Sequence, residues 1–236
     1  MKTDVTARSS PKLLGLIVRR ERWGLSGRGW LILALAILLA GWGLGLNLHS
    51  FLAVTRRVPA KVLVVEGWIH NYGVDAAVSE FKTGHYDRLL TTGGPVEGYG
   101  PASSIYDTDA WQSAGLLKQA GLPAAVVQAV PSCLVGRDRT YNSAIALRIW
   151  LREHDQHIGS LNVLTEDAHA RRTWLLFQSA LGPEIQVGII SVRNPDYDAD
   201  HWWRSSTGVR EVIDESIAYG YAKVFFHPAK PVAQVP

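Results

Sequence analysis

Residues 161–173, LNVLTEDAHARRT, contain an apolar run, a polar turn, and then a histidine and two arginines that enter a predicted helix. The pattern is typical of a buried strand that feeds a helix through a short loop. In open α/β sheets the ligand crevice lies at this place, because strand ends and helix N-termini converge there. His169 and Arg172 are three residues apart and share one helical face, whereas Arg171 points elsewhere. The stretch therefore predicts an α/β fold with an ionisable site at a strand end.

Strand-like and helix-like patterns alternate along the rest of the chain. Short apolar or β-branched runs predict strands at residues 61–65, 88–92, 126–130, 161–165 and 187–192. Helical patterns and stop signals predict helices at residues 74–83, 106–120, 140–154, 168–181 and 208–224. Such alternation implies parallel pairing through right-handed crossovers. We expect a three-layer, Rossmann-like α/β domain at residues 61–228, with a mostly parallel sheet of about five strands and a flexible tail at 229–236.

A membrane helix is predicted ahead of this domain. Residues 29–55 contain no Asp, Glu, Lys or Arg, and residues 30–48 are almost wholly apolar. About 20 such residues cross a bilayer core as a helix, and the run is longer than the roughly 7 to 15 apolar residues of a cleaved signal peptide. We predict a retained single-pass anchor at residues 29–49 and a connector at 50–60. The alternative is a buried helix of a soluble protein.

The distribution of charge indicates the orientation of that helix. Residues 1–28 hold seven of the 24 Lys and Arg residues and two of the 21 Asp and Glu residues, which leaves 17 basic and 19 acidic residues for the remainder. A basic segment before the span favours a cytoplasmic N-terminal tail, with the domain outside the cytoplasm at the plasma (inner) membrane. The lipid bilayer is then a partner. A nucleic-acid partner is not expected, because the basic excess belongs to the tail.

Glycine and polar residues follow several predicted strands or begin the next helices. We expect them to line one pocket, because the strand-to-helix loops of a parallel sheet open on one edge. The candidates are Glu66, Gly93, Gly94, Asp109, Arg139, Thr140, Asn142, His169 and Arg172. A small anionic ligand suits this set, because it combines cations, a histidine and helix N-termini.

Several of these residues, and two nearby aspartates, also have a structural interpretation. Asn142 either contacts the ligand or satisfies loop carbonyls, and His169 is either functional or a hydrogen-bonded structural histidine. Gly93-Gly94 is either a close approach for a phosphate or only a turn. Asp138 and Asp167 are either helix N-caps or ligand contacts. Arg139 either binds the ligand or pairs with Asp109 or Glu66.

No cofactor is assigned from the sequence. GxGxxG and Walker motifs are absent, so a standard dinucleotide or P-loop site is unsupported. Glu66, Asp167, His169 and His201 match no recognised metal-site spacing, and Cys133 is the only cysteine, so we expect no metal. Trp202-Trp203 is more typical of a lid or a core plug than of a stacking platform.

An ordered set of segments resembles the SanA/YdcF/ElyC-like domain of unknown function over residues 61–192. The segments are VLVVEGW (62–68), TTGGP (91–95), Thr108-Asp109-Ala110, DRTYNSA (138–144) and LTEDAHARR (164–172). The resemblance implies a Rossmann-like fold, a single N-terminal membrane helix and a role in envelope integrity or a drug barrier. It assigns family motif positions to Gly93, Gly94, Asp109, Thr140, Asn142, His169 and Arg172.

The chain also departs from that family pattern. Arg139, Tyr141 and Glu166 stand where the family usually has Asn, Glu and Ser. One cytoplasmic branch of the family is similar to S-adenosylmethionine binders, but these departures weaken any transfer of ligand identity.

Two classes of function follow from the candidate residues. The first is an envelope enzyme, a hydrolase or transferase, acting on a phosphorylated or otherwise anionic precursor, lipid-linked precursors included. Arg139 and Arg172 would hold the anion, His169 would act as general acid or base, and Asp109 or Glu66 would orient it or activate water. The second is a non-catalytic envelope module that binds a ligand, such as a nucleotide or an S-adenosylmethionine-like molecule, or a partner. The absence of a nucleophile motif such as GxSxG also leaves open a purely structural scaffold.

Overall fold

Five parallel strands form the centre of the α/β domain. The computed structural model describes residues 25–96, 107–132, 138–154 and 158–228. The strands are β1 (Val62–Glu66), β2 (Arg88–Gly93), β3 (Val127–Pro131), β4 (Ser160–Glu166) and β5 (Gln186–Val192). They lie in the order β3-β2-β1-β4-β5, and each neighbouring pair is parallel. The predicted α/β, Rossmann-like sheet is confirmed.

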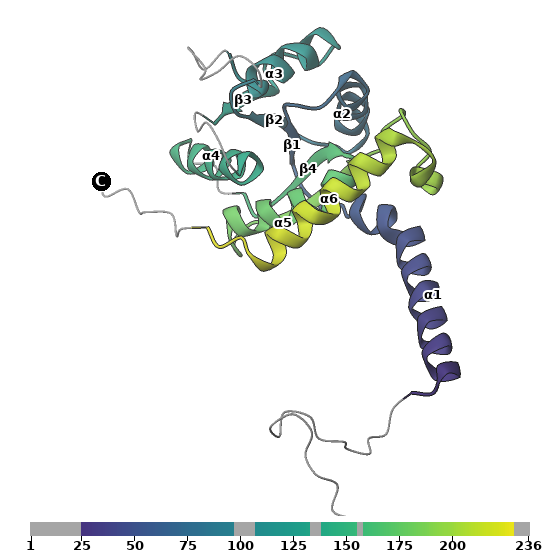
Figure 1. Ribbon diagram of the computed structural model, residues 1–236. Coiled ribbons are helices and arrows are strands. Elements are labelled where there is room, and N and C mark those ends of the chain that lie inside the picture. Colours follow the sequence, from purple (N-terminus) through teal and green to yellow (C-terminus); the bar gives the residue numbers. More distant parts are fainter. Residues whose placement is uncertain (1–24, 97–106, 133–137, 155–157, 229–236) are drawn as a thin grey trace, which may run out of the picture. The chain divides into compact units, whose positions relative to one another are not determined.

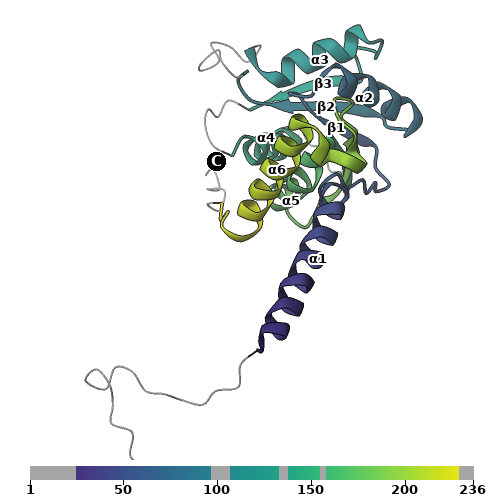
Figure 2. The ribbon, with the colours of Figure 1, turned by 45° about the vertical axis from the view of Figure 1, so that its right-hand side comes forward.

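Helices cover both faces of this sheet, as Figures 1 and 2 show. One face carries α2 (Asn71–Thr83) and α3 (Asp109–Gln119). The other carries α4 (Arg139–Glu153) and α5 (Ala170–Leu181), and α6 (Ser206–Val224) packs against α5. Two short 3-10 helices, η2 (Asp167–His169) and η3 (Ala199–Arg204), precede α5 and α6. The predicted three-layer arrangement is therefore present.

Alternate residues of each strand belong to two separate cores. Leu63 and Val65 of β1 pack with the side chains of α2 and α3, whereas Val62 and Val64 pack with those of α4 and α5. Successive strand residues point to opposite faces of a sheet. Because both faces are covered, β1 reads in the sequence as a continuous apolar run up to Glu66.

The order of the strands reverses between β1 and β4. β2 and β3 extend the sheet on one side of β1, and β4 and β5 extend it on the other. The loops after β1 and β4 therefore lead to opposite faces and leave a crevice beyond the strand ends. Glu66 ends β1, and the turn that carries His169 follows β4. The ionisable stretch of the sequence lies at this switch point.

Element boundaries differ slightly from the sequence prediction. β1 ends at Glu66 rather than Val65, and α2 begins at Asn71 rather than Val74. α6 begins at Ser206, because the hydroxyl of Ser205 accepts a hydrogen bond of 2.9 Å from the Gly208 N–H and caps the helix. The predicted helix at residues 168–181 is divided into η2 and α5. The predicted helix start at residue 106 lies outside the described residues.

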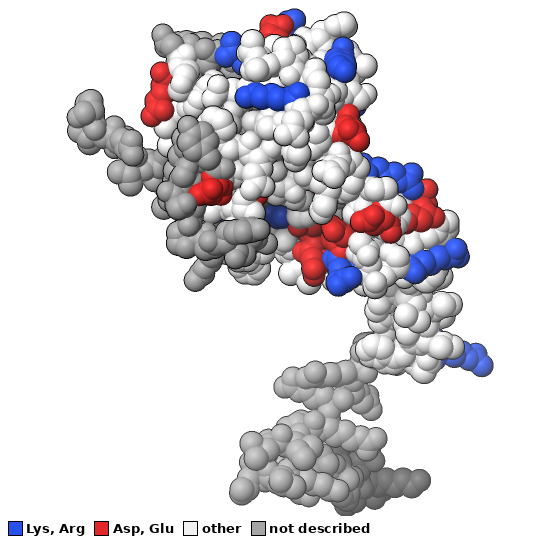
Figure 3. All heavy atoms as spheres, turned by 90° about the horizontal axis from the view of Figure 1, so that it is seen from above, with Lys and Arg blue, Asp and Glu red and all other residues white. Residues whose placement is uncertain are grey.

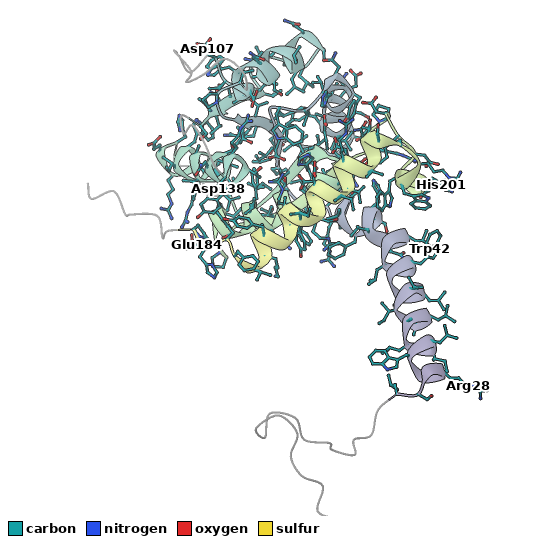
Figure 4. The ribbon with its side chains drawn as sticks, viewed as in Figure 1. Arg28, Trp42, Asp107, Asp138, Glu184 and His201 are labelled. Carbon is teal, nitrogen blue, oxygen red and sulfur yellow. The ribbon has the colours of Figure 1, made fainter. Side chains whose placement is uncertain are left out.

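α1 (Gly27–Leu52) is the one helix among the described residues that is long and apolar enough to cross a membrane. Its 26 residues exceed the length needed for a bilayer core of about 30 Å. Arg28 is its only Asp, Glu, Lys or Arg residue, and Figure 4 shows Arg28 and Trp42 projecting from the helix. None of its most apolar window is buried.

The end of α1 belongs to the α/β domain. The chain divides into two units, Met1–Gly43 and Leu44–Pro236, so the boundary lies inside the helix. His49 is buried, and its Nε2 lies 2.8 Å from Oδ1 of Asp167 in η2. Leu52 packs in a cluster with Tyr197 and Trp202. The helix therefore continues beyond the predicted anchor, and Trp202 is a core residue.

The connector after α1 crosses the edge of the sheet. Arg56 pairs with Ile189 of the edge strand β5, and the backbone N–H and C=O of Val58 each form a 2.9 Å hydrogen bond with the side-chain amide of Asn162. The chain passes directly over Gly188, where a Cβ would lie 1.9 Å from Oδ1 of Asn162 and 2.9 Å from the Val58 nitrogen. A residue without a side chain is required there.

We expect Gly188→Ala to destabilise the full chain by about 1–3 kcal/mol, the usual cost of overpacking. The added methyl group would displace the Asn162 amide from Val58. Urea unfolding of the full chain in lipid nanodiscs, followed by tryptophan fluorescence, measures the change.

Gly115→Ala in α3 is the matched control. A Cβ at this position meets no atom within 4 Å, so alanine should stabilise the helix by about 0.5–1 kcal/mol. Equal free energies of unfolding for the two variants would contradict the account of the connector.

Candidate functional site

A cavity of 650 Å³ lies beyond the strand ends at the switch point. Eight of the nine predicted site residues line it: Glu66, Gly93, Gly94, Asp109, Arg139, Thr140, His169 and Arg172. They come from the ends of β1 and β2, the starts of α3 and α4, η2 and the first turn of α5. The fold thus brings together residues that are more than 100 positions apart in the sequence.

Asn142 is the predicted site residue that is not among the lining residues. It lies in the first turn of α4, and its backbone N–H donates a 2.9 Å hydrogen bond to the Asp138 carbonyl. Thr140 and Ser143 are three residues apart on one face of α4, and both line the cavity. Asn142 lies off that face.

Glu215 of α6 joins His169 and Arg172 in a buried ionic cluster. The Arg172 guanidinium donates to both carboxylate oxygens, with Nε 2.7 Å from Oε2 and Nη2 2.8 Å from Oε1. His169 Nδ1 lies 3.0 Å from Oε1 of Glu215. His169 Nδ1 also lies 3.0 Å from Nη2 of Arg172. If Nδ1 carries a hydrogen, these two atoms form no hydrogen bond with each other, because both are then donors. With Nδ1 protonated, both groups donate to the carboxylate.

The cluster shifts the pKa values of its members in opposite directions. Burial alone would raise the pKa of Glu215, but hydrogen bonds from His169 and Arg172 outweigh it and lower that pKa to about 2. Burial alone would lower the pKa of His169, but the hydrogen bond and negative charge of Glu215 outweigh it and raise that pKa. A protonated His169 leaves the His169–Arg172–Glu215 cluster with two positive groups and one negative group.

Glu66 supplies a second ionisable side chain to the cavity. It is buried at the end of β1, and its Oε2 accepts a 2.9 Å hydrogen bond from the Thr173 hydroxyl. Its negative charge also raises the pKa values of His169 and Arg172. Glu66 and His169 therefore both border the space that a ligand would occupy.

Asp109 and Arg139 form an ion pair across the cavity wall. Nη2 of Arg139 lies 2.8 Å from Oδ2 of Asp109, so one of the structural alternatives for Arg139 is present. The start of α3 approaches the sheet closely. A Cβ on Gly93 would lie 2.6 Å from the Asp109 Cβ, and a Cβ on Gly67 would lie 2.5 Å from the Asp109 carbonyl carbon. Gly93 is therefore required for packing α3, whatever it contributes to a ligand.

Thr92 is a lining residue that the sequence-based site did not include. Its side chain is 1% exposed, and its hydroxyl has no hydrogen-bond partner among the described residues. A buried polar group without a partner costs about 1–3 kcal/mol. Because Thr92 lines the cavity, a ligand could supply the missing hydrogen bond. Its position at a strand end before Gly93 is the sequence signal that could have identified it.

The acidic residues of the turns have separate roles. Asp138 precedes α4 in a left-handed conformation with φ 61° and makes no side-chain capping bond, although it lines the cavity. Asp167 is neither an N-cap nor a lining residue of this cavity. It has φ 36°, and its side chain accepts a 2.6 Å hydrogen bond from the Tyr197 hydroxyl as well as contacting His49. These contacts stabilise a backbone conformation that few residues other than glycine adopt.

Glu166, which departs from the family pattern, faces α2. It accepts hydrogen bonds from the Tyr72 hydroxyl at 2.7 Å and from the His70 ring at 2.9 Å. Among the described residues, no group of three or more His, Cys, Asp and Glu side chains could hold a metal ion.

No family model matches the chain, and no curated protein matches it. The proposal for its function therefore rests on the geometry of the cavity.

We expect Glu215→Gln to lower the pKa of His169 below its usual 6.5, because burial and the Arg172 charge both act in that direction once the carboxylate charge is gone. Nitrogen NMR of the imidazole ring as a function of pH measures this change. Glu211→Gln is the matched control, because Glu211 lies 4.0 Å from His169 and should have a smaller effect. An unchanged His169 pKa in Glu215→Gln would contradict the cluster.

Glu215→Gln should also change how the free energy of unfolding depends on pH below pH 4.5. The lowered pKa of Glu215 contributes stability that is present above pH 4.5 and is lost as the pH falls towards 2. Glu215→Gln removes this pH dependence and, because it breaks a buried ion pair, costs about 3–5 kcal/mol.

Proposed function

We propose that this is a membrane-anchored protein whose α/β domain binds a phosphate-bearing ligand in the cavity and carries out acid–base chemistry on it, as a hydrolase or transferase. The observation that carries the proposal is the His169–Arg172–Glu215 cluster. It fixes a histidine and an arginine at the wall of a 650 Å³ cavity, and within the cluster these two cations outnumber the one carboxylate when His169 is protonated.

Three features of the cavity favour an anion. Nη1 of Arg172 carries two hydrogens and reaches only the Thr140 hydroxyl, at 3.5 Å, within the part of the chain that the structure describes. The unpartnered Thr92 hydroxyl supplies another donor. The starts of α3 and α4 border the cavity, and helix N-termini carry partial positive charge.

The acid–base assignment is narrower than the sequence suggested. Asp109 is held by Arg139, so it is poorly placed to accept a proton from a ligand. Among the described residues the Glu66 side chain accepts a hydrogen bond from Thr173, and Glu66 lines the cavity. We assign His169 as general acid, because its raised pKa favours the protonated ring near neutral pH. Glu66 then serves as the base that activates water or a hydroxyl group.

The anchoring and the location form part of the same proposal. α1 supports a single-pass anchor, and the basic N-terminal segment supports a cytoplasmic tail with the domain on the outer side of the plasma (inner) membrane. The resemblance to the SanA/YdcF/ElyC-like domain supports a role in envelope biogenesis or barrier maintenance. On the face seen in Figure 3, acidic and basic side chains are interspersed, which does not favour a nucleic-acid surface there.

We expect Arg172→Lys to weaken binding of inorganic phosphate and glucose 1-phosphate by about tenfold, because one ammonium group cannot both bridge the two carboxylate oxygens of Glu215 and reach the ligand as the three guanidinium nitrogens do. Arg171→Lys is the matched control. The neighbouring Arg171 guanidinium stacks 3.9 Å from the Phe51 ring rather than lining the cavity. Calorimetric titration of the full chain in nanodiscs measures the affinities. Equal effects of the two variants would refute the proposed phosphate site.

His169→Gln separates an enzyme from a binding module. With glucose 1-phosphate, an enzyme would lose release of phosphate and keep the affinity, whereas a binding module would show no release in either protein. Nucleotides and S-adenosylmethionine in the same titration test the alternative ligands.

The proposed orientation predicts which side of the membrane each cysteine faces. In a Cys133→Ser background, Gln119→Cys on the exposed surface of α3 should react with a membrane-impermeant maleimide on intact cells. Ser10→Cys in the N-terminal tail should react only after the cells are lysed. The reverse pattern would place the domain in the cytoplasm.

A further inference from the structure

The cavity has an apolar half that the proposed acid–base chemistry does not use. Leu176 of α5 and three side chains on or just after α6, Ala218, Ala222 and Phe226, line this half. Phe226 packs edge-on against Tyr141 of α4, with ring centres 5.1 Å apart. None of these four lining side chains has a polar atom. The cavity therefore joins a wall that suits an anion to a wall that suits a hydrocarbon.

An exposed apolar patch continues from this wall to the surface. Ile217, Tyr221, Val224 and Phe225 are 66%, 53%, 60% and 69% exposed. Tyr221 is four residues from both Ile217 and Phe225 and three from Val224, which places the four on one side of the end of α6. Tyr221 belongs both to the patch and to the cavity lining. Clustered apolar side chains of this exposure mark an interaction site rather than ordinary surface.

The cavity is also large enough for a ligand with an apolar part beside the phosphate group. A volume of 650 Å³ falls within the range of about 300–1,000 Å³ found for pockets that hold drug-sized ligands. A phosphate group between Thr92, His169 and Arg172 would leave the apolar half empty. Water there would find few hydrogen-bond partners, because the wall is aliphatic and aromatic.

We propose that the ligand is an amphiphile, a phosphate ester of a long alkyl or isoprenoid chain. The phosphate lies at the polar end near Thr92, His169 and Arg172, and the chain lies along Leu176 and Ala222 and leaves the cavity past Tyr221. This inference rests on the proposed function, which supplies the polar end of the site. An anchor in the bilayer gives such a domain direct access to molecules that partition into lipid.

A chain-length series tests this inference. The full chain in phosphatidylcholine nanodiscs is titrated calorimetrically with methyl, butyl, hexyl and octyl phosphate, and empty nanodiscs measure the partitioning to be subtracted. We expect the dissociation constant to fall by about fourfold for each added methylene, which corresponds to burial of about 0.8 kcal/mol per group.

Ala222→Trp, which fills the apolar half, should abolish the dependence on chain length and leave the affinity for methyl phosphate unchanged. Ile213→Trp is the matched control, because Ile213 lies on the same helix, is 40% exposed and does not line the cavity. Ala218→Leu makes a smaller intrusion and repeats the test if tryptophan impairs folding.

Each outcome separates the two proposals. Binding of methyl phosphate without any gain from longer chains would overturn the amphiphile and leave the phosphate site standing. A chain-length dependence that persists in Ala222→Trp and Ala218→Leu would place the chain elsewhere and would also overturn it. Binding of none of the four esters would overturn both.

Discussion

The buried carboxylate of Glu215 is the constraint on which the site depends. Glu215 follows Arg172 by 43 residues in the sequence, and its carboxylate accepts two hydrogen bonds from the Arg172 guanidinium. A charge in that position must be compensated, since a buried ion without partners is strongly destabilising. Glu215 therefore holds α6 against α5, orients His169 and places the apolar residues of α6 over the cavity. One ion pair thus determines both the electrostatics and the wall of the site.

The architecture could be predicted from the sequence because the sheet is buried on both faces. Runs such as Val62–Val65 are apolar throughout, and the glycines and polar turns between such runs mark the crossovers. The boundaries were less predictable, since they depend on contacts between distant residues. η2 begins at Asp167, whose side chain His49 and Tyr197 bind while its backbone has a positive φ, and α5 starts only at Ala170 rather than at residue 168. Propensity in the local sequence contains none of that information.

The candidate site was predictable to the extent that topology decides it. Residues at strand ends and helix starts, such as Glu66, Gly93 and His169, meet because parallel strands share one edge. Glu215 was not predictable, because it lies within a helix and its role comes from packing against α5. The unpartnered state of Thr92 is likewise a property of its surroundings. Asn142 was predicted from the family pattern, but the orientation of α4 places Ser143, and not Asn142, in the cavity wall.

The hydrogen bond between His49 and Asp167 determines where an independently folding fragment can begin. A truncation at the end of α1 would remove His49 and Leu52, leave the carboxylate of Asp167 without that partner and uncover Tyr197 and Trp202. A truncated chain should therefore begin inside α1, after Gly43, so that the last two turns of the helix are kept. Exchange of the apolar helix between proteins of this architecture would therefore have to preserve the last turns of α1 as part of the globular fold.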